Sequence, residues 1–85
     1  MLEYPAISHR GADPPYAQIA GRIEEAIRGG DLAAGDVLPS EGDIMQATGC
    51  GRTTVRRAMR RLRDQGLIVT VPTRGSYVAR GIPPG

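Results

Sequence analysis

The stretch RTTVRRAMRRLR, residues 52–63, decides the fold, and six of its twelve residues are arginine. Its apolar residues recur at intervals of three and four, which predicts an α-helix with one buried stripe. Arginines recur at similar intervals along an adjacent face, and no acid interrupts them before Asp64. Like charges one turn apart repel each other, so this helix is expected to face something negative, such as a phosphate backbone. The stripe consists of Val55, Ala58, Met59 and Leu62, and the adjacent face of Arg52, Arg56, Arg60 and Arg63.

Two helices are expected upstream of this basic helix. Pro14-Pro15 suits a helix start, apolar residues follow with helical spacing from Tyr16 to Ile27, and Gly29-Gly30 supplies the stop. A shorter helix is expected to begin near Glu41 and to end at Thr48-Gly49.

Ser40 is expected to cap this second helix. A full capping box would need glutamate or glutamine three residues later, where Asp43 stands, so we expect a simple serine cap. Only Cys50-Gly51 separates this helix from the basic helix. Two helices joined by a short turn that contains glycine form a helix-turn-helix.

After Gly66 the hydrophobic period changes. Residues 67–71 are β-branched and apolar, residues 72–75 have turn chemistry, and residues 76–79 alternate again, which predicts a β-hairpin. A brief extended piece is also expected at Val37-Leu38. Three helices followed by a hairpin form the α+β winged helix-turn-helix, whose third helix enters the major groove while the hairpin tip reaches adjacent backbone or groove.

The expected organisation is a flexible N-terminal arm at residues 1–13, one domain at 14–80 and a tail at 81–85. Charge is distributed unevenly, since residues 15–50 hold six acids and two arginines, whereas residues 51–85 hold eight arginines and one acid. This asymmetry indicates an anionic partner more strongly than the net charge of +2 does.

Metal, disulfide, membrane and enzymatic functions are all disfavoured. Cys50 is the only cysteine and His9 the only histidine, so no zinc ligand set and no internal disulfide are expected, nor is any cofactor. Cys50 is expected to be a small core residue, and His9 to be exposed. No run of eighteen apolar residues occurs, which points to a cytoplasmic protein without a membrane span. The chain also lacks a Ser–His–Asp set and a Walker-type glycine loop.

Several short motifs follow one another at characteristic separations. They are YAQIA at 16–20, IRGGDL at 27–32, GD at 35–36, LPSE at 38–41, RTTVRRA at 52–58, GL at 66–67 and RGSYV at 74–78. Together they resemble the DNA-binding domain of GntR-type bacterial transcriptional regulators, over residues 16–79. The resemblance implies a winged helix that binds operator DNA.

The resemblance places Arg52 and Arg56 on base edges, Thr53 and Thr54 on phosphates, and Gly75 close to the minor groove. For the two arginines, side-chain chemistry supports the same assignment. The N-terminal end of a recognition helix points into the major groove, and a guanidinium group matches guanine O6 and N7. Solvated surface charges, first-turn threonines and a glycine required only by the turn stay open as alternatives. Further contacts to DNA, either to its phosphate backbone or through the wing, are expected from Ser40, Arg57, Arg60 and Arg74.

The sequence departs from the family pattern at four positions, one of which is Cys50, where an apolar residue is expected. Gly42 stands where such regulators usually have an arginine that contacts DNA, so one contact implied by the resemblance is missing. Gly51 replaces the usual serine or threonine cap of the recognition helix. Thr73 replaces the first glycine of the wing, which is expected to alter the turn.

The function favoured by these features is sequence-specific transcriptional regulation, with repression the simplest mode because occluding a promoter needs no further surface. One recognition helix reads few base pairs, so we expect a homodimer on a palindromic operator of double-stranded DNA. Five residues after Arg80 leave no room for an effector domain, so no effector ligand is expected within the chain. Two alternatives stay open: an architectural, plasmid-maintenance or recombination accessory DNA-binding protein, and a winged helix that binds an acidic protein.

Overall fold

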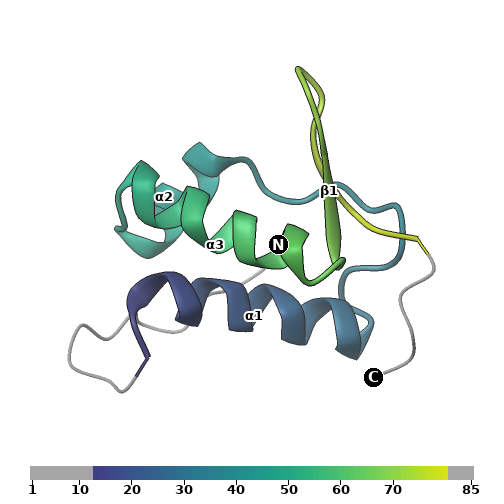
Figure 1. Ribbon diagram of the computed structural model, residues 1–85, viewed down its shortest axis with the longest axis horizontal. Helices are drawn as coiled ribbons and strands as arrows, with labels where there is room; N and C mark the ends of the chain where they lie inside the picture. Colours follow the sequence, from purple (N-terminus) through teal and green to yellow (C-terminus); the bar gives the residue numbers. More distant parts are fainter. Residues whose placement is uncertain (1–12, 81–85) are drawn as a thin grey trace.

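The computed structural model describes residues 13–80. Helices α1 (Pro15–Gly29), α2 (Glu41–Thr48) and α3 (Arg52–Asp64) precede the antiparallel strands β1 (Ile68–Val71) and β2 (Gly75–Val78). In Figure 1 α3 lies against α1, α2 lies beside the first turns of α3, and the hairpin stands away from the helices as a wing. The expected α+β winged helix-turn-helix is therefore confirmed. The expected tail and all of the expected arm except Asp13, His9 included, fall outside the described residues.

Helix α1 begins and ends where its sequence predicts. Pro14 is the N-cap and Pro15 the first helical residue, a position where the missing proline N–H leaves no bond unmade. Gly30 ends the helix in the left-handed conformation, with φ of 91°, which glycine adopts without a steric penalty. The apolar face of α1 packs on α3 and buries Ile19, Ala20, Ile23, Ala26 and Ile27.

Helix α2 has a capping box, and the expectation of a simple serine cap was wrong. The backbone N–H of Asp43 donates to Ser40 Oγ at 3.0 Å, and the backbone N–H of Ser40 donates to Asp43 Oδ2 at 3.4 Å. Aspartate at this position is therefore long enough to reach back to the cap, although its bond is the longer of the two. The reciprocal pair satisfies two backbone donors and fixes the start of α2.

The buried stripe of α3 is the one that the sequence predicts. Val55, Ala58, Met59 and Leu62 are each at most 3% exposed. Ile44 of α2 joins them, and Cys50 packs partly buried against this core, as expected. Within residues 13–80 no polar or charged side chain is buried, so the core is held by apolar packing alone. Gly51, the N-cap of α3, supplies no side-chain hydrogen bond.

The hairpin pairs Ile68 with Val78 and Val71 with Gly75 at its two ends. Val37 forms a single bridge to Tyr77, which confirms the brief extended piece expected beside Leu38. The segment between α1 and α2 thus passes the base of the wing, as Figure 1 shows, and ties it to the helices.

The hairpin turn is shorter than expected. The sequence predicted a turn over residues 72–75, but Gly75 already belongs to β2. The backbone N–H of Arg74 donates to the carbonyl of Val71 at 3.0 Å, which closes a four-residue turn. Pro72 occupies the second position of this turn, and Thr73 the third with φ of 65°. A positive φ at the third position favours glycine, and a β-branched residue there is strained.

Replacing Thr73 by glycine should therefore stabilise the domain. Strain of this kind costs on the order of 1–3 kcal/mol, and the greater freedom of glycine in the unfolded chain offsets about 0.5–1 kcal/mol of the gain. We expect Thr73→Gly to raise the free energy of unfolding by about 1 kcal/mol, measured by urea denaturation. Unchanged or lower stability would mean that the Thr73 hydroxyl, which donates to the carbonyl of Pro72 at 2.6 Å, outweighs the strain.

Gly75→Ala is the converse control. Gly75 has φ of 113°, and a Cβ there would meet nothing within 4 Å, so a loss of stability would report backbone strain alone.

Candidate nucleic-acid interface

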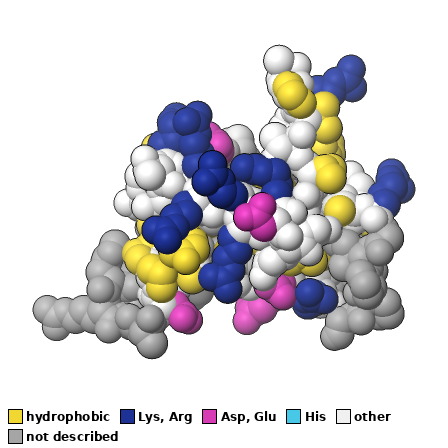
Figure 2. Space-filling view, viewed as in Figure 1, with side chains coloured by type: hydrophobic (Ala, Val, Ile, Leu, Met, Phe, Trp, Pro, Cys, Tyr) yellow, Lys and Arg dark blue, Asp and Glu magenta, His cyan; other side chains and the backbone are white. Residues whose placement is uncertain are grey.

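The exposed side of α3 is strongly basic. All six of its arginines are exposed, and Figure 2 shows arginine side chains gathered over the surface that α3 crosses. Because the apolar stripe of α3 is packed against the core, the arginines have no route except outward. The helix therefore presents a cationic face suited to an anionic surface.

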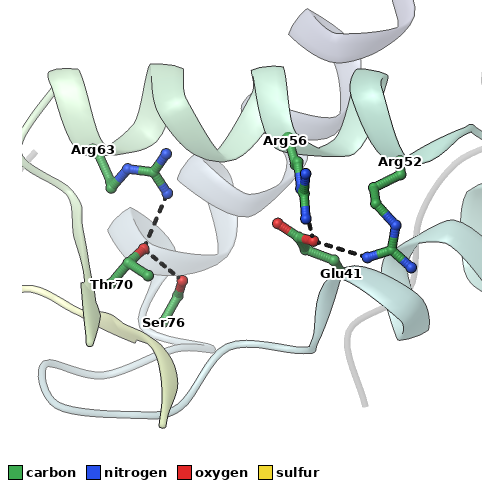
Figure 3. Close-up of polar contacts among 6 residues, drawn as sticks. All are labelled: Glu41, Arg52, Arg56, Arg63, Thr70 and Ser76. Carbon is green, nitrogen blue, oxygen red and sulfur yellow. Dashed lines mark hydrogen bonds and ion pairs between the residues drawn. The ribbon is translucent and has the colours of Figure 1, made fainter. Parts of the chain in front are cut away.

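Glu41 of α2 lies between two of these arginines. Its Oε1 accepts a hydrogen bond from Arg52 Nη1 at 3.1 Å and another from Arg56 Nε at 3.2 Å (Figure 3). No acid stands among these arginines in the sequence before Asp64, and the structure supplies one from another helix. Glu41 precedes Arg52 by eleven residues, and the helix-turn-helix brings the first turns of α2 and α3 together.

This contact is solvent-accessible. The side chains of Arg52 and Arg56 are 54% and 64% exposed, and that of Glu41 is 35% exposed. Exposed ion pairs contribute only about 0–1 kcal/mol each. The two guanidinium groups are thus held in place weakly enough to exchange partners.

A second polar cluster joins the far end of α3 to the wing. Arg63 Nη1 donates to Thr70 Oγ1 at 3.0 Å, and the hydroxyls of Thr70 and Ser76 lie 2.9 Å apart. Thr70 and Ser76 are cross-strand partners in the hairpin. Figure 3 shows Arg63 pointing to the same side of α3 as Arg52 and Arg56, so this side of the helix is polar from end to end.

Sequence reasoning assigned no role to Thr70 or Ser76, although a signal was present. Each lies two residues from a buried strand residue, Ile68 or Val78, so both project from the strand face that packs toward the helices. Hydroxyls on that face, near the end of a basic helix, could have been paired with Arg63.

Arg57 is oriented toward α1. Its guanidinium lies 4.0 Å from the centre of the Tyr16 ring, a cation–π contact of about 0.5–1 kcal/mol at an exposed site. It also lines a shallow, open hollow of about 340 Å³, together with Tyr16, Arg60, Arg61, Asp64 and Gln65. Arg57 and Arg60 thus lie outside the cluster around Glu41.

The other expected contact residues surround this basic side. Thr53 is exposed in the first turn of α3, where Thr54 is half-buried. Ser40 is exposed, and its hydroxyl oxygen is already engaged in the capping box. Arg74 and Gly75 are exposed at the tip of the wing, apart from the helices.

Across residues 13–80, His, Cys, Asp and Glu side chains nowhere form a group of three that could hold a metal ion. Nor does any helix within these residues have the length and apolar character needed to cross a membrane.

A winged helix with an exposed, arginine-rich third helix is the arrangement typical of helix-turn-helix DNA-binding domains. Residues 15–78 match the family of bacterial regulatory proteins called the gntR family. The chain therefore belongs to the GntR family, as its motifs indicated.

Known proteins of this family resemble the chain in sequence and in structure. The mannosyl-D-glycerate transport/metabolism system repressor MngR of Escherichia coli is 43% identical over 68 residues, which are 80% of this chain and 28% of that protein. The GntR-family transcription factor YtrA of Sulfolobus acidocaldarius superposes with a TM-score of 0.81 at 37% identity, covering 89% of this chain and 80% of that one. The chain thus spans less than a third of the length of MngR.

A solved complex with DNA is also similar. The DNA-binding domain of AraR, crystallised with operator ORX1, has a TM-score of 0.82 at 30% identity, covering 91% of this chain and 98% of that one. This chain accordingly carries a winged helix of the kind that binds double-stranded operator DNA. Relatives that are regulators and repressors favour transcription regulation over the architectural, plasmid-maintenance or recombination alternative.

The cluster of Arg63, Thr70 and Ser76 should restrain the wing. Thr70→Val keeps a strand-forming residue but removes the oxygen that Arg63 binds. We expect the free energy of unfolding to change by less than about 1 kcal/mol, because exposed hydrogen bonds contribute little, while the NMR order parameters of the wing amides fall. Thr53→Val, at an exposed threonine of α3, is the control. Wing amides as rigid in Thr70→Val as in the native protein would contradict the restraint.

Proposed function

We propose that this chain is the DNA-binding part of a sequence-specific transcriptional repressor, which reads the major groove with the first turns of α3. The observation that carries the proposal is the pair Arg52 and Arg56, exposed one turn apart and bound to one carboxylate oxygen. Guanidinium groups at this end of a recognition helix can donate bidentately to guanine O6 and N7. Each such contact discriminates between bases by about 1–3 kcal/mol.

Phosphate contacts set the register of the helix on the duplex. Thr53 and Thr54 lie in the first turn of α3, and Ser40 caps the neighbouring α2, so all three surround the base-reading pair. Arg57 and Arg60 lie further along α3, where the backbone is the partner we propose. Arg74 and Gly75 place the wing tip, within residues 72–75, on an adjacent groove or backbone.

The functional unit we propose is residues 14–80, acting in the cytoplasm as a homodimer on a palindromic operator. One recognition helix contacts too few base pairs to select a site in a genome, and a two-fold pair doubles the sequence read. Repression is supported by the repressor MngR among the relatives. No effector is assigned to this chain, and its winged helix matches only a minor part of that relative.

Selection of random duplexes by the purified protein tests sequence-specific binding. The native protein should recover a palindromic motif, and the double variant Arg52→Ala/Arg56→Ala should recover none, because both base contacts are gone. Arg60→Ala should weaken binding to all duplexes alike, since a phosphate contact carries no sequence information. Equal losses on the motif and on random DNA in the double variant would contradict base reading by this pair.

Binding should also depend steeply on salt. With about six phosphates neutralised per domain, a plot of the logarithm of the DNA-binding constant against the logarithm of the salt concentration should have a slope of roughly −5.

Gly42 offers a gain-of-function test. A Cβ at Gly42 would lie 3.8 Å from Ser40 Oγ, an ordinary contact, so the backbone next to Glu41 accepts a side chain without a clash at Cβ. Gly42→Arg should bind DNA about tenfold more tightly, because it restores a cationic contact that the family usually has. Gly42→Ala controls for the improved helix propensity. The measurement is fluorescence anisotropy with labelled duplexes, and equal affinities of Gly42→Arg and Gly42→Ala would refute the restored contact.

A further inference from the structure

Among the ion pairs of residues 13–80, the two that involve α3 share a single oxygen, Glu41 Oε1. From this arrangement we infer that Glu41 is a positioning residue and a determinant of specificity. It orients Arg52 and Arg56 toward base edges and repels phosphate, so that α3 binds a matched site well and random DNA poorly. The inference rests on the proposed base reading by this arginine pair.

The donor inventory of the two guanidinium groups supports orientation. Each guanidinium has five N–H donors. Glu41 engages Arg56 through Nε, which leaves both terminal nitrogens of Arg56 free for guanine O6 and N7. It engages Arg52 through Nη1 alone, so most donors of Arg52 also stay available. The carboxylate therefore holds each arginine by one side and leaves donors for a base.

The electrostatics support discrimination. Two guanidinium groups one helical turn apart repel each other, and a carboxylate between them offsets this repulsion. The same negative charge reduces the attraction of this end of α3 for any phosphate, whatever the sequence of the duplex. A matched site compensates through base contacts, whereas random DNA offers only phosphates to an arginine pair that is already partly neutralised.

Glu41 is held where it can act in this way. It is the first residue of α2, where the capping box of Ser40 and Asp43 fixes the backbone. One turn further on, Ile44 is fully buried in the core. Since neither anchor involves the Glu41 side chain, changing its charge or length should leave the helix in place.

Three variants separate orientation from charge. Glu41→Gln removes the charge and keeps the length, Glu41→Asp keeps the charge but is one methylene shorter, and Glu25→Gln removes one charge from an exposed site on α1. Each is titrated at low salt with the selected motif and with a random duplex of equal length. The Nε–H NMR signal of Arg56 in the free protein reports the contact directly.

We expect Glu41→Gln to bind random DNA about tenfold more tightly than the native protein does. The ratio of its affinity for the motif to its affinity for random DNA should fall about tenfold. Glu41→Asp should bind random DNA like the native protein but bind the motif more weakly, because its carboxylate does not span both arginines. Glu25→Gln should keep the native ratio. Hydrogen exchange at Arg56 Nε should be faster in Glu41→Gln than in the native protein.

Specific results would overturn the inference. A native ratio in Glu41→Gln, or an equal fall of the ratio in Glu25→Gln, would show that Glu41 does not set specificity. An unchanged rate of hydrogen exchange at Arg56 Nε in Glu41→Gln would show that Glu41 does not orient Arg56. If the native protein itself prefers no sequence, the proposed function fails first; if it prefers one and Glu41→Gln keeps that preference, only the role of Glu41 fails.

Discussion

The packing of the apolar stripe of α3 against α1 is the constraint on which the rest of the structure depends. Val55 and Leu62 are fully buried, as are Ile19 and Ile23 on α1. With this face of α3 fixed, its six arginines must lie on the outside, however much they repel each other. The core thereby determines both the fold and the orientation of the basic face, without a buried polar side chain within residues 13–80 to assist it.

Much of this fold could be predicted from the sequence, because its signals are local. The apolar spacing of α1 and α3 predicted their buried faces. Gly30 and Gly49, both with positive φ, mark the ends of two helices, and the change of hydrophobic period after Gly66 predicted the hairpin. The exposed placement of the arginines followed from the same periodicity. What periodicity identifies is the face of an element, and that was sufficient to locate the candidate interface.

The partners across that interface could not be predicted in the same way, because they depend on how elements pack. Glu41 and Arg52 are eleven residues apart and meet only when α2 and α3 are docked. Thr70 meets Arg63 only because the turn after α3 brings β1 beside the last turn of that helix. The capping box was missed for a different reason, since the consensus requires a longer acid than Asp43, whereas hydrogen bonding requires only sufficient reach.

Charge shows most clearly how sequence and surface differ. Along the chain, acids dominate residues 15–50 and arginines dominate residues 51–85, which suggests an acidic half and a basic half. In space the helix-turn-helix inserts one acid, Glu41, into the basic face, between Arg52 and Arg56, the pair that we propose reads bases. A uniformly basic face would attract every phosphate alike, and its binding would be mostly non-specific. A face on which one carboxylate orients two guanidinium groups offers direction as well as charge, and direction is what base recognition requires.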